Sequence, residues 1–177
     1  MMNTSVVPSR LTAIGTYVPS RVLRNADLEK MVETSDEWIL QRTGIHERRM
    51  AADDEFTSDL AIAAVQNMAD TYQKELTDVD LILVATSTPD YPFPSVASQI
   101  QAHFGIAQAG AMDLAATCAG FTYALHTANA MISSGLHRKV LVVAAETLTK
   151  VTDYTDRTTC ILFGDGAGAV LVEADEE

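Results

Sequence analysis

One cysteine, Cys118, stands between a run of small residues and an aromatic helical pattern in LAATCAGFTYAL, Leu114 to Leu125. This setting could hold a nucleophile, because the free N–H groups and the dipole at a helix N-terminus stabilise a thiolate. Ala119 and Gly120 would leave the sulfur open to a substrate. Most free cysteines, however, are small buried hydrophobes. Position alone leaves both interpretations open.

The second cysteine and the histidines show no pattern of a metal site or a catalytic base. Cys160 lies beside Ile161 in TTCILFGDG, where the interior of a strand and a core position are predicted. His126 follows Cys118 on the same predicted helix at roughly 12 Å along the axis, too far to touch the sulfur. No histidine pair has metal-ligand spacing, so no metal is predicted. The base has no candidate among His46, His103, His126 and His137.

The segment TSDEWILQRTGIHERR, residues 34–49, predicts a binding helix. Thr34, Trp38 and Arg42 are spaced i, i+4, i+8, which would place a hydroxyl, an indole and a cation on one helix face. An indole can stack on an adenine ring, and a guanidinium can bind its phosphates. The same pattern also fits a tryptophan that anchors the helix in the core and an arginine that caps its end.

The glycine run GDGAG, Gly164 to Gly168, is similar to a phosphate-binding loop. Such a loop needs a helix after the glycines, so that the helix N-terminus meets the phosphates. The pattern AVLVE that follows here is that of a strand. We therefore predict a tight turn between two strands.

The elements that must position these residues alternate between strand and helix. This alternation predicts an α/β layered domain with a mostly parallel mixed sheet between helices. Thr57 or Ser58 is the expected N-cap of the second helix, Gly135 ends the third, and the proline-rich TPDYPFPS forms a rigid loop. The predicted strands are Leu11–Val18, Asp80–Ser87, GAMDLAA before Cys118, Lys139–Glu146 and Gly168–Glu173, and the predicted helices are Ser35–Arg42, Thr57–Leu76 and Ala119–Ser134.

The composition argues against several function classes. Twelve basic against twenty-four acidic residues give a formal net charge of −12, which disfavours nucleic-acid binding because that relies on Lys and Arg. No apolar run reaches the roughly 20 residues needed to cross a bilayer. The opening MMNTSVVPSR lacks the features of a secretion signal. The two cysteines form no CxxC pair, so reduced thiols and a cytoplasmic location are expected.

Five segments together resemble the β-ketoacyl-acyl carrier protein synthase III family of fatty-acid biosynthesis. The resemblance implies a thiolase-like fold and an acyltransferase that condenses an acyl-CoA primer with malonyl-acyl carrier protein, releasing carbon dioxide through an acyl-cysteine intermediate. Acyl-CoA would be a substrate, so no cofactor is implied. The segments follow the family's order from about Leu11 to the last residue: NADLEKMVETSDEWILQRTGIHERR, PFPS, DLAATCAGFTYAL, TDYTDRTT and FGDGAGA.

The resemblance also implies roles for single residues, beginning with Cys118 as the acylated nucleophile. Four residues match the family's coenzyme A contacts, the first two on either side of the adenine: Trp38, Arg157, Arg42 and Thr34. Four match positions at the acyl pocket: Ser87, Phe93, Leu148 and Phe163. Among these, Phe93 matches a residue that one subunit inserts at its partner's pocket, so a homodimer is expected.

Residues 1–177 match only the N-terminal thiolase-like half of that family. The family's catalytic histidine and asparagine belong to the second half, which has no counterpart here, and the terminal VEADEE looks like a cut. Two other functions stay open. One is a different thiolase-fold condensing enzyme, which the segment around Trp38 and the GDGAGA run make less favoured. The other is a non-catalytic acyl-CoA-binding module, if the chain is naturally complete.

Overall fold

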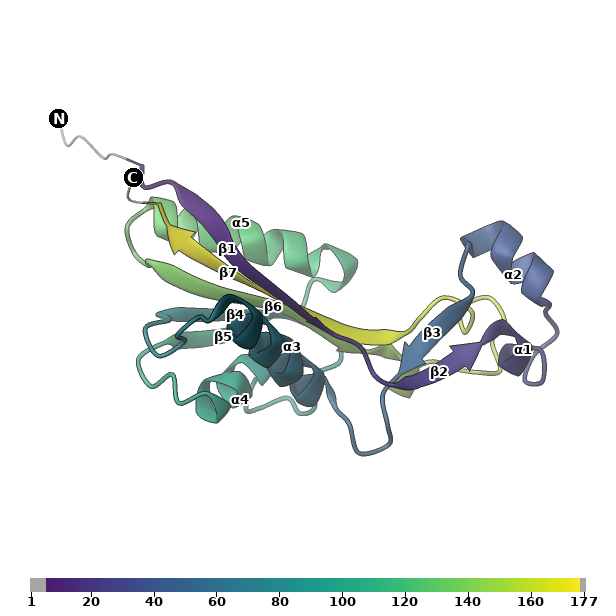
Figure 1. Ribbon diagram of the computed structural model, residues 1–177. Helices are drawn as coiled ribbons and strands as arrows, with labels where there is room; N and C mark the ends of the chain where they lie inside the picture. Colours follow the sequence, from purple (N-terminus) through teal and green to yellow (C-terminus); the bar gives the residue numbers. More distant parts are fainter. Residues whose placement is uncertain (1–5, 176–177) are drawn as a thin grey trace.

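A five-stranded mixed sheet organises residues 6–175, the part of the chain that this computed structural model describes. Its strand order is β1-β7-β6-β4-β5 (Figure 1). Parallel pairing joins β4 to β5 and to β6, while β7 runs antiparallel to β6 and to β1. The strands are β1 (Ser9–Tyr17), β4 (Leu81–Ala85), β5 (Gly110–Leu114), β6 (Lys139–Thr147) and β7 (Asp165–Ala174).

The predicted α/β fold with a mixed sheet between helices is confirmed, although only two of the four strand pairings are parallel. The opening stretch considered for a secretion signal and the end of VEADEE lie partly outside the described residues.

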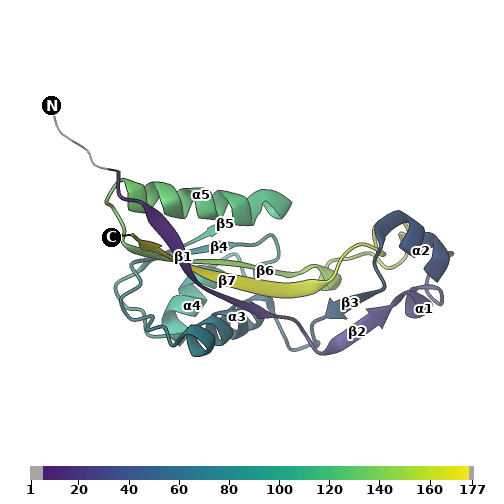
Figure 2. The same ribbon diagram turned by 45° about the horizontal axis from the view of Figure 1, so that its top comes forward.

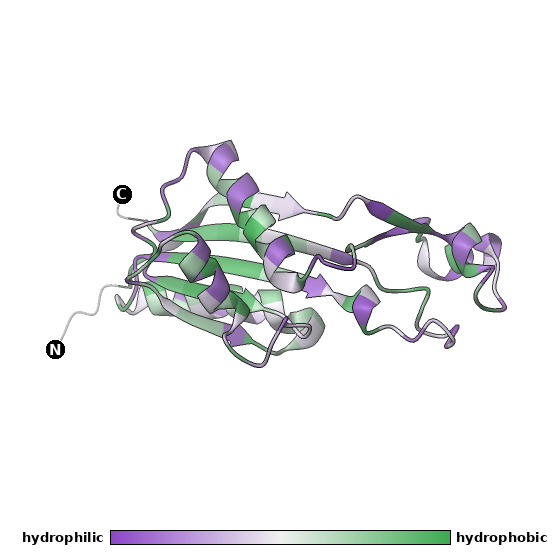
Figure 3. Ribbon diagram, turned by 90° about the horizontal axis from the view of Figure 1, so that it is seen from below, coloured by the Kyte–Doolittle hydropathy of each residue, from purple (hydrophilic) through white to green (hydrophobic). Residues whose placement is uncertain are grey.

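Helices cover both faces of the sheet (Figure 2). The helices α3 (Thr57–Tyr72) and α4 (Val96–His103) lie on one face, and α5 (Gly120–Ser133) lies on the other. The hydrophobic residues follow the strands in Figure 3. They form two clusters, because alternate strand residues point to opposite faces. In β4, Ile82 packs toward α3 and α4, and Leu83 packs toward α5.

Close packing explains one glycine at the α3 face. A Cβ on Gly15 would lie 2.4 Å from the backbone oxygen of Ala64 and 2.4 Å from the backbone nitrogen of Met68. Only a residue without a side chain lets α3 lie this close to β1.

A second group of elements projects from one end of the sheet (Figure 1). We call it the arm. It consists of the hairpin strands β2 (Arg21–Arg24) and β3 (Glu47–Met50) with the helices α1 (Asn25–Leu28) and α2 (Asp36–Thr43). A separate apolar cluster joins the arm to the segment after β6: Leu23, Leu28, Ile39, Cys160 and Ile161.

A buried arginine fastens the arm to that segment. Arg48 of β3 is 4% exposed. Its Nε and one terminal nitrogen donate to the backbone oxygen of Ile161, and the other terminal nitrogen donates to Oδ1 of Asn25. Burial lowers the pKa of Arg48 from its ordinary value, because desolvation disfavours the charged form.

Two local predictions near the C-terminal end of the chain are wrong. Residues Asp165–Gly168 of the glycine run lie within β7 rather than in a turn, and a Cβ on Gly166 would sit 3.4 Å from the backbone oxygen of Tyr17. Glycine suits a strand where a neighbouring backbone comes this near. Cys160 is fully buried, as predicted, but it lies in a turn, where its N–H donates to the Asp156 oxygen.

The predicted ends of α3 are also wrong. Phe56 is its N-cap, since the Asp59 carboxylate accepts from the Phe56 N–H and the Thr57 hydroxyl is engaged with the Thr88 oxygen. The helix ends at Tyr72 rather than Leu76, because Gln73 adopts a left-handed conformation with φ 53°. By contrast, Gly135 follows α5 with φ 76°, as its predicted role requires.

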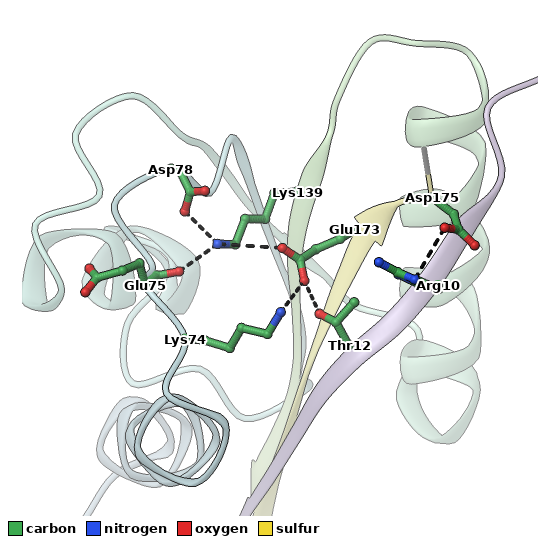
Figure 4. A network of polar contacts seen from close by, with 8 residues as sticks. All are labelled: Arg10, Thr12, Lys74, Glu75, Asp78, Lys139, Glu173 and Asp175. Atoms are coloured by element: carbon green, nitrogen blue, oxygen red, sulfur yellow. Dashed lines mark hydrogen bonds and ion pairs between the residues drawn. The ribbon is translucent and has the colours of Figure 1, made fainter. Parts of the chain in front are cut away.

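The partly buried carboxylate of Glu173, near the end of β7, lies close to Lys139 at the start of β6 (Figure 4). Glu173 accepts from Lys74 at 2.6 Å and from the Thr12 hydroxyl, and Lys139 lies 3.8 Å from it. Lys139 is buried and also donates to Asp78 at 2.6 Å. Burial alone would raise the pKa of Glu173, but the hydrogen bonds from Lys74 and Thr12 outweigh it and the pKa lies below its ordinary value.

We expect Glu173→Gln to be less stable than the wild type at neutral pH, by a margin that shrinks in acid. A carboxyl group with a lowered pKa stabilises the fold above the unfolded-state value of 4.5, and this stabilisation is lost as pH falls through the folded-state value. Urea unfolding from about pH 7 to about pH 3 measures the margin. Glu75→Gln, at an exposed side chain, is the control. A margin that stays constant with pH would contradict the expectation.

Candidate functional site

Cys118 lies at the step from β5 into α5, as predicted. It occupies the short 3-10 helix η1 (Thr117–Ala119), directly before Gly120 begins α5, and it is exposed. The preceding Thr117 has φ 46°, a left-handed conformation that is rare for a β-branched residue. Strained residues of this kind cluster at functional sites, where the surrounding structure holds them in place.

Close contact with β4 fixes the start of α5. A Cβ on Gly120 would lie 2.9 Å from the Cβ of Ala85, the last residue of β4. Glycine therefore lets α5 begin directly against the sheet. This contact places Cys118 at the carboxyl ends of the parallel strands, the edge where ligands bind in open α/β sheets.

Cys118 lines a cavity of about 330 Å³. The structure brings three of the predicted acyl-pocket residues to this cavity: Ser87, Leu148 and Phe163. The fourth, Phe93, does not line it; its side chain is 84% exposed on the loop between β4 and α4. The cavity is also lined by Thr117 and Glu146, which the sequence pattern did not single out.

Glu146 holds the loop that follows β4. Its Oε1 accepts from the Ser87 N–H at 2.8 Å. Its Oε2 accepts from the Thr88 hydroxyl at 2.5 Å and from the Thr86 hydroxyl at 3.3 Å. One carboxylate therefore serves three consecutive residues of the loop.

Two further threonines, Thr57 and Thr147, continue this hydrogen-bond network from Thr88. The Thr88 hydroxyl accepts from the Thr147 N–H at 2.9 Å. The Thr57 hydroxyl lies 2.9 Å from the Thr147 hydroxyl, and it donates to the backbone oxygen of Thr88 at 2.5 Å. The N-terminus of α3, the end of β6 and the loop after β4 are thus joined by hydroxyl groups.

A second pocket, of about 270 Å³, lies at the arm. Trp38 is half-buried on α2, and the guanidinium carbons of Arg157 and Arg42 lie 5.2 and 5.3 Å from its ring centre. Both distances are typical of cation–π contacts. The pocket is lined by Glu33, Thr34, Ser35, Trp38 and Arg157.

Thr34 does not lie on the helix face predicted for it. Ser35 is the N-cap of α2, with its hydroxyl accepting from the Trp38 N–H at 3.2 Å, so the helix begins at Asp36. Thr34 nevertheless lines the same pocket as Trp38. Its hydroxyl oxygen is buried and has no hydrogen-bond partner within the described residues.

Within residues 6–175, no group of three or more His, Cys, Asp or Glu side chains could hold a metal ion. No helix in the same range is both long and apolar enough to cross a membrane.

The family model of 3-oxoacyl-[acyl-carrier-protein] synthase III matches residues 112–177. A β-ketoacyl-[acyl-carrier-protein] synthase III 2 of Halalkalibacterium halodurans is 67% identical over 172 residues, which cover 97% of this chain and 52% of that protein. The corresponding protein of Bacillus subtilis is 65% identical over 169 residues, with 96% and 52% covered. The chain thus spans about half the length of the curated relatives it matches.

Solved structures of similar proteins superpose on this chain. The 3-oxoacyl-[acyl-carrier-protein] synthase III of Aquifex aeolicus superposes with a TM-score of 0.92 at 45% identity, covering 96% of this chain and 55% of that one. The β-ketoacyl-[acyl-carrier-protein] synthase III of Thermus thermophilus gives 0.89 at 52% identity, with 93% and 51% covered. A priming β-ketosynthase of the R1128 polyketide pathway gives 0.92 at 37% identity, with 98% and 52% covered.

Proposed function

We propose that this chain, which belongs to the β-ketoacyl-[acyl-carrier-protein] synthase III family and corresponds to the N-terminal half of its members, binds an acyl-CoA and accepts the acyl group on Cys118. One observation carries the proposal. An exposed cysteine at the start of a helix lines a cavity together with Leu148 and Phe163. This cavity is large enough for a short acyl chain.

The proposed transfer is a thioester exchange. The Cys118 thiol gives up its proton, and its sulfur attacks the thioester carbonyl carbon of the acyl-CoA. The bond from that carbon to the coenzyme A sulfur breaks, and coenzyme A leaves as a thiolate that takes up a proton. Backbone N–H groups at the start of α5, which follows Cys118, are donors of the kind that stabilise a developing oxyanion.

In the complete reaction, the acyl group would pass from Cys118 to malonyl-acyl carrier protein. Loss of carbon dioxide leaves the electrons of the broken bond on the malonyl carbon, which attacks the acyl carbonyl and releases the cysteine. The resemblance assigns the stabilising histidine and asparagine to the half of the family that this chain does not match. The chain therefore supplies the acyl-accepting part of the proposed reaction.

The pocket at Trp38 is the proposed site for the adenine end of coenzyme A. The indole offers a stacking surface, and the guanidinium groups of Arg42 and Arg157 offer positive charge beside it. Thr34 lines the same pocket beside Trp38 and Arg157.

A homodimer and a cytoplasmic location complete the proposal. The side chain of Phe93 is 84% exposed on a proline-rich loop, where it is free to reach a second subunit. Both cysteines are free thiols, as expected in a reducing compartment.

We expect Trp38→Ala to weaken acyl-CoA binding by about 5- to 150-fold, since base stacking on an aromatic side chain contributes about 1–3 kcal/mol. Trp38 also packs partly against the apolar cluster of the arm, so some stability will be lost with it. Isothermal titration below the unfolding range of both proteins separates the two effects. Trp38→Phe, which keeps an aromatic face, should bind more tightly than Trp38→Ala. Unchanged affinity in the folded Trp38→Ala protein would contradict this site.

Acyl transfer itself is tested by incubating the chain with an acyl-CoA of short chain length. Intact-mass spectrometry should show one added acyl group, and peptide mapping should place it on Cys118. A chain that binds acyl-CoA but never gains the acyl group would overturn the proposed transfer and leave a binding module. An adduct located on another residue would contradict the assignment of Cys118.

A further inference from the structure

We infer that Glu146 is a positioning residue that sets the shape of the cavity beside Cys118, and thereby the size of acyl group that fits; its relevance to acyl groups rests on the proposed function. It touches the loop that walls the cavity rather than the reacting atoms.

Strand alternation explains why Glu146 reaches this cavity. On β6, Val140 and Val142 pack into the cluster covered by α5. Successive residues point to opposite faces of a sheet, so Ala144 and Glu146 continue the same row. Ala144 is paired with Ala85, which touches the first residue of α5. Glu146 is the next residue of this row, and it lines the same cavity as Cys118.

The carboxylate replaces strand pairing where pairing ends. The pairing of β4 with β6 stops at Ala85, two residues before Ser87. The Ser87 N–H therefore needs another acceptor, and Oε1 of Glu146 supplies it at 2.8 Å. The same carboxylate accepts the Thr88 hydroxyl, which in turn accepts the Thr147 N–H. The Glu146 side chain thereby holds the loop to the end of β6, and this attachment can be removed by substituting Glu146.

This attachment relates the two walls of the cavity to each other. Ser87 belongs to the loop that Glu146 holds, and Leu148 follows Glu146 by two residues in the chain. The separation between these two lining residues is therefore fixed through the Glu146 carboxylate. Discrimination between acyl groups that differ by one methylene is about 10–200-fold in a well-formed apolar pocket, and it depends on such fixed walls.

The closing experiment measures cavity shape without requiring acyl transfer. Cys118 is alkylated with N-alkylmaleimides of increasing chain length, from methyl to octyl, and the rates are compared as ratios. The proteins are the wild type, Glu146→Ala, Glu146→Gln and the control Glu75→Ala, at an exposed side chain outside the cavity lining. Urea unfolding confirms that each variant is folded.

We expect Glu146→Ala to change the ratio of short- to long-chain rates by about tenfold or more, while the N-methylmaleimide rate changes little. Glu146→Gln should lie between the wild type and Glu146→Ala, because an amide oxygen can still accept the Ser87 N–H. If only Glu146→Gln folds, its intermediate shift carries the test.

Two results would overturn the inference. Ratios equal to those of the wild type in the folded variants would show that Glu146 does not shape the cavity. An equal fall for all reagents, N-methylmaleimide included, would mean that Glu146 acts on the thiol itself. A second series with acyl-CoA thioesters separates this inference from the proposed function. Altered maleimide ratios in a chain that accepts no acyl group would support the role of Glu146 and contradict acyl transfer.

Discussion

After incubation with a short acyl-CoA, the folded Cys118→Ala chain is expected to carry no acyl adduct. The Cys160→Ala chain is expected to carry the same adduct as the wild type. Cys118 is exposed at a cavity, and Cys160 is fully buried in the apolar cluster of the arm. Burial also raises the pKa of the Cys160 thiol, so that little thiolate forms at neutral pH. The two variants remove one sulfur each, which makes them matched controls for intact-mass spectrometry.

An adduct that survives in Cys118→Ala would contradict this result. A reaction in concentrated urea checks access directly, since unfolding should expose the sulfur of Cys160 to a thiol reagent.

The wild-type chain alone is expected to stop at the acyl-cysteine when malonyl-acyl carrier protein is added. Removal of one oxyanion donor typically costs about 10²–10³ in rate, and the resemblance places several such groups outside this chain. Product formed at enzymatic rates would show that the chain supplies these groups itself.

Arg48→Ala is expected to destabilise the arm by about 2–5 kcal/mol, because it leaves the Ile161 oxygen and the Asn25 side chain without their buried donors. The loss should also disturb the pocket at Trp38, since Arg157 belongs to the segment that Arg48 holds. Trp38 is the single tryptophan of the chain, so its fluorescence reports on the arm alone.

Urea unfolding followed by tryptophan fluorescence and by circular dichroism tests this expectation. The fluorescence transition should move to lower urea than the dichroism transition, because the arm would open before the sheet. Arg49→Ala is the control, since the neighbouring side chain is half-exposed and bonds to Pro19. Coincident transitions that match those of the wild type would contradict a fastening role for Arg48.

The parts of the fold that were predictable follow local patterns. Continuous apolar runs identified β4 and β6, and helical periodicity identified α3 and α5. The step that carries Cys118 was visible because small residues and a helix start are neighbours in sequence. The hairpin of the arm was missed, since its strands are four residues each, too short for a periodic signal.

The site was less predictable, because it depends on residues far apart in the chain. Trp38 and Arg157 meet across the arm with no shared motif, and only the family resemblance connected them. Glu146 was predicted only as the last residue of a strand, with no role for its side chain. Its three acceptor contacts became visible only when the loop after β4 was placed beside it.

The position of β7 has a consequence for how the chain folds. β7 is synthesised after the other four strands of this sheet, yet it lies between β1 and β6, and its pairing joins Ser9 to Ala174 (Figure 1). The residues of β1 are therefore synthesised long before those of β7, the strand that pairs with β1 within residues 6–175. During that interval, Leu11 and Ile14 belong to an unpaired strand, while β4, β5 and β6 can already associate with their helices. Late pairing of this kind slows completion of the sheet and leaves the unpaired strand exposed to aggregation during synthesis.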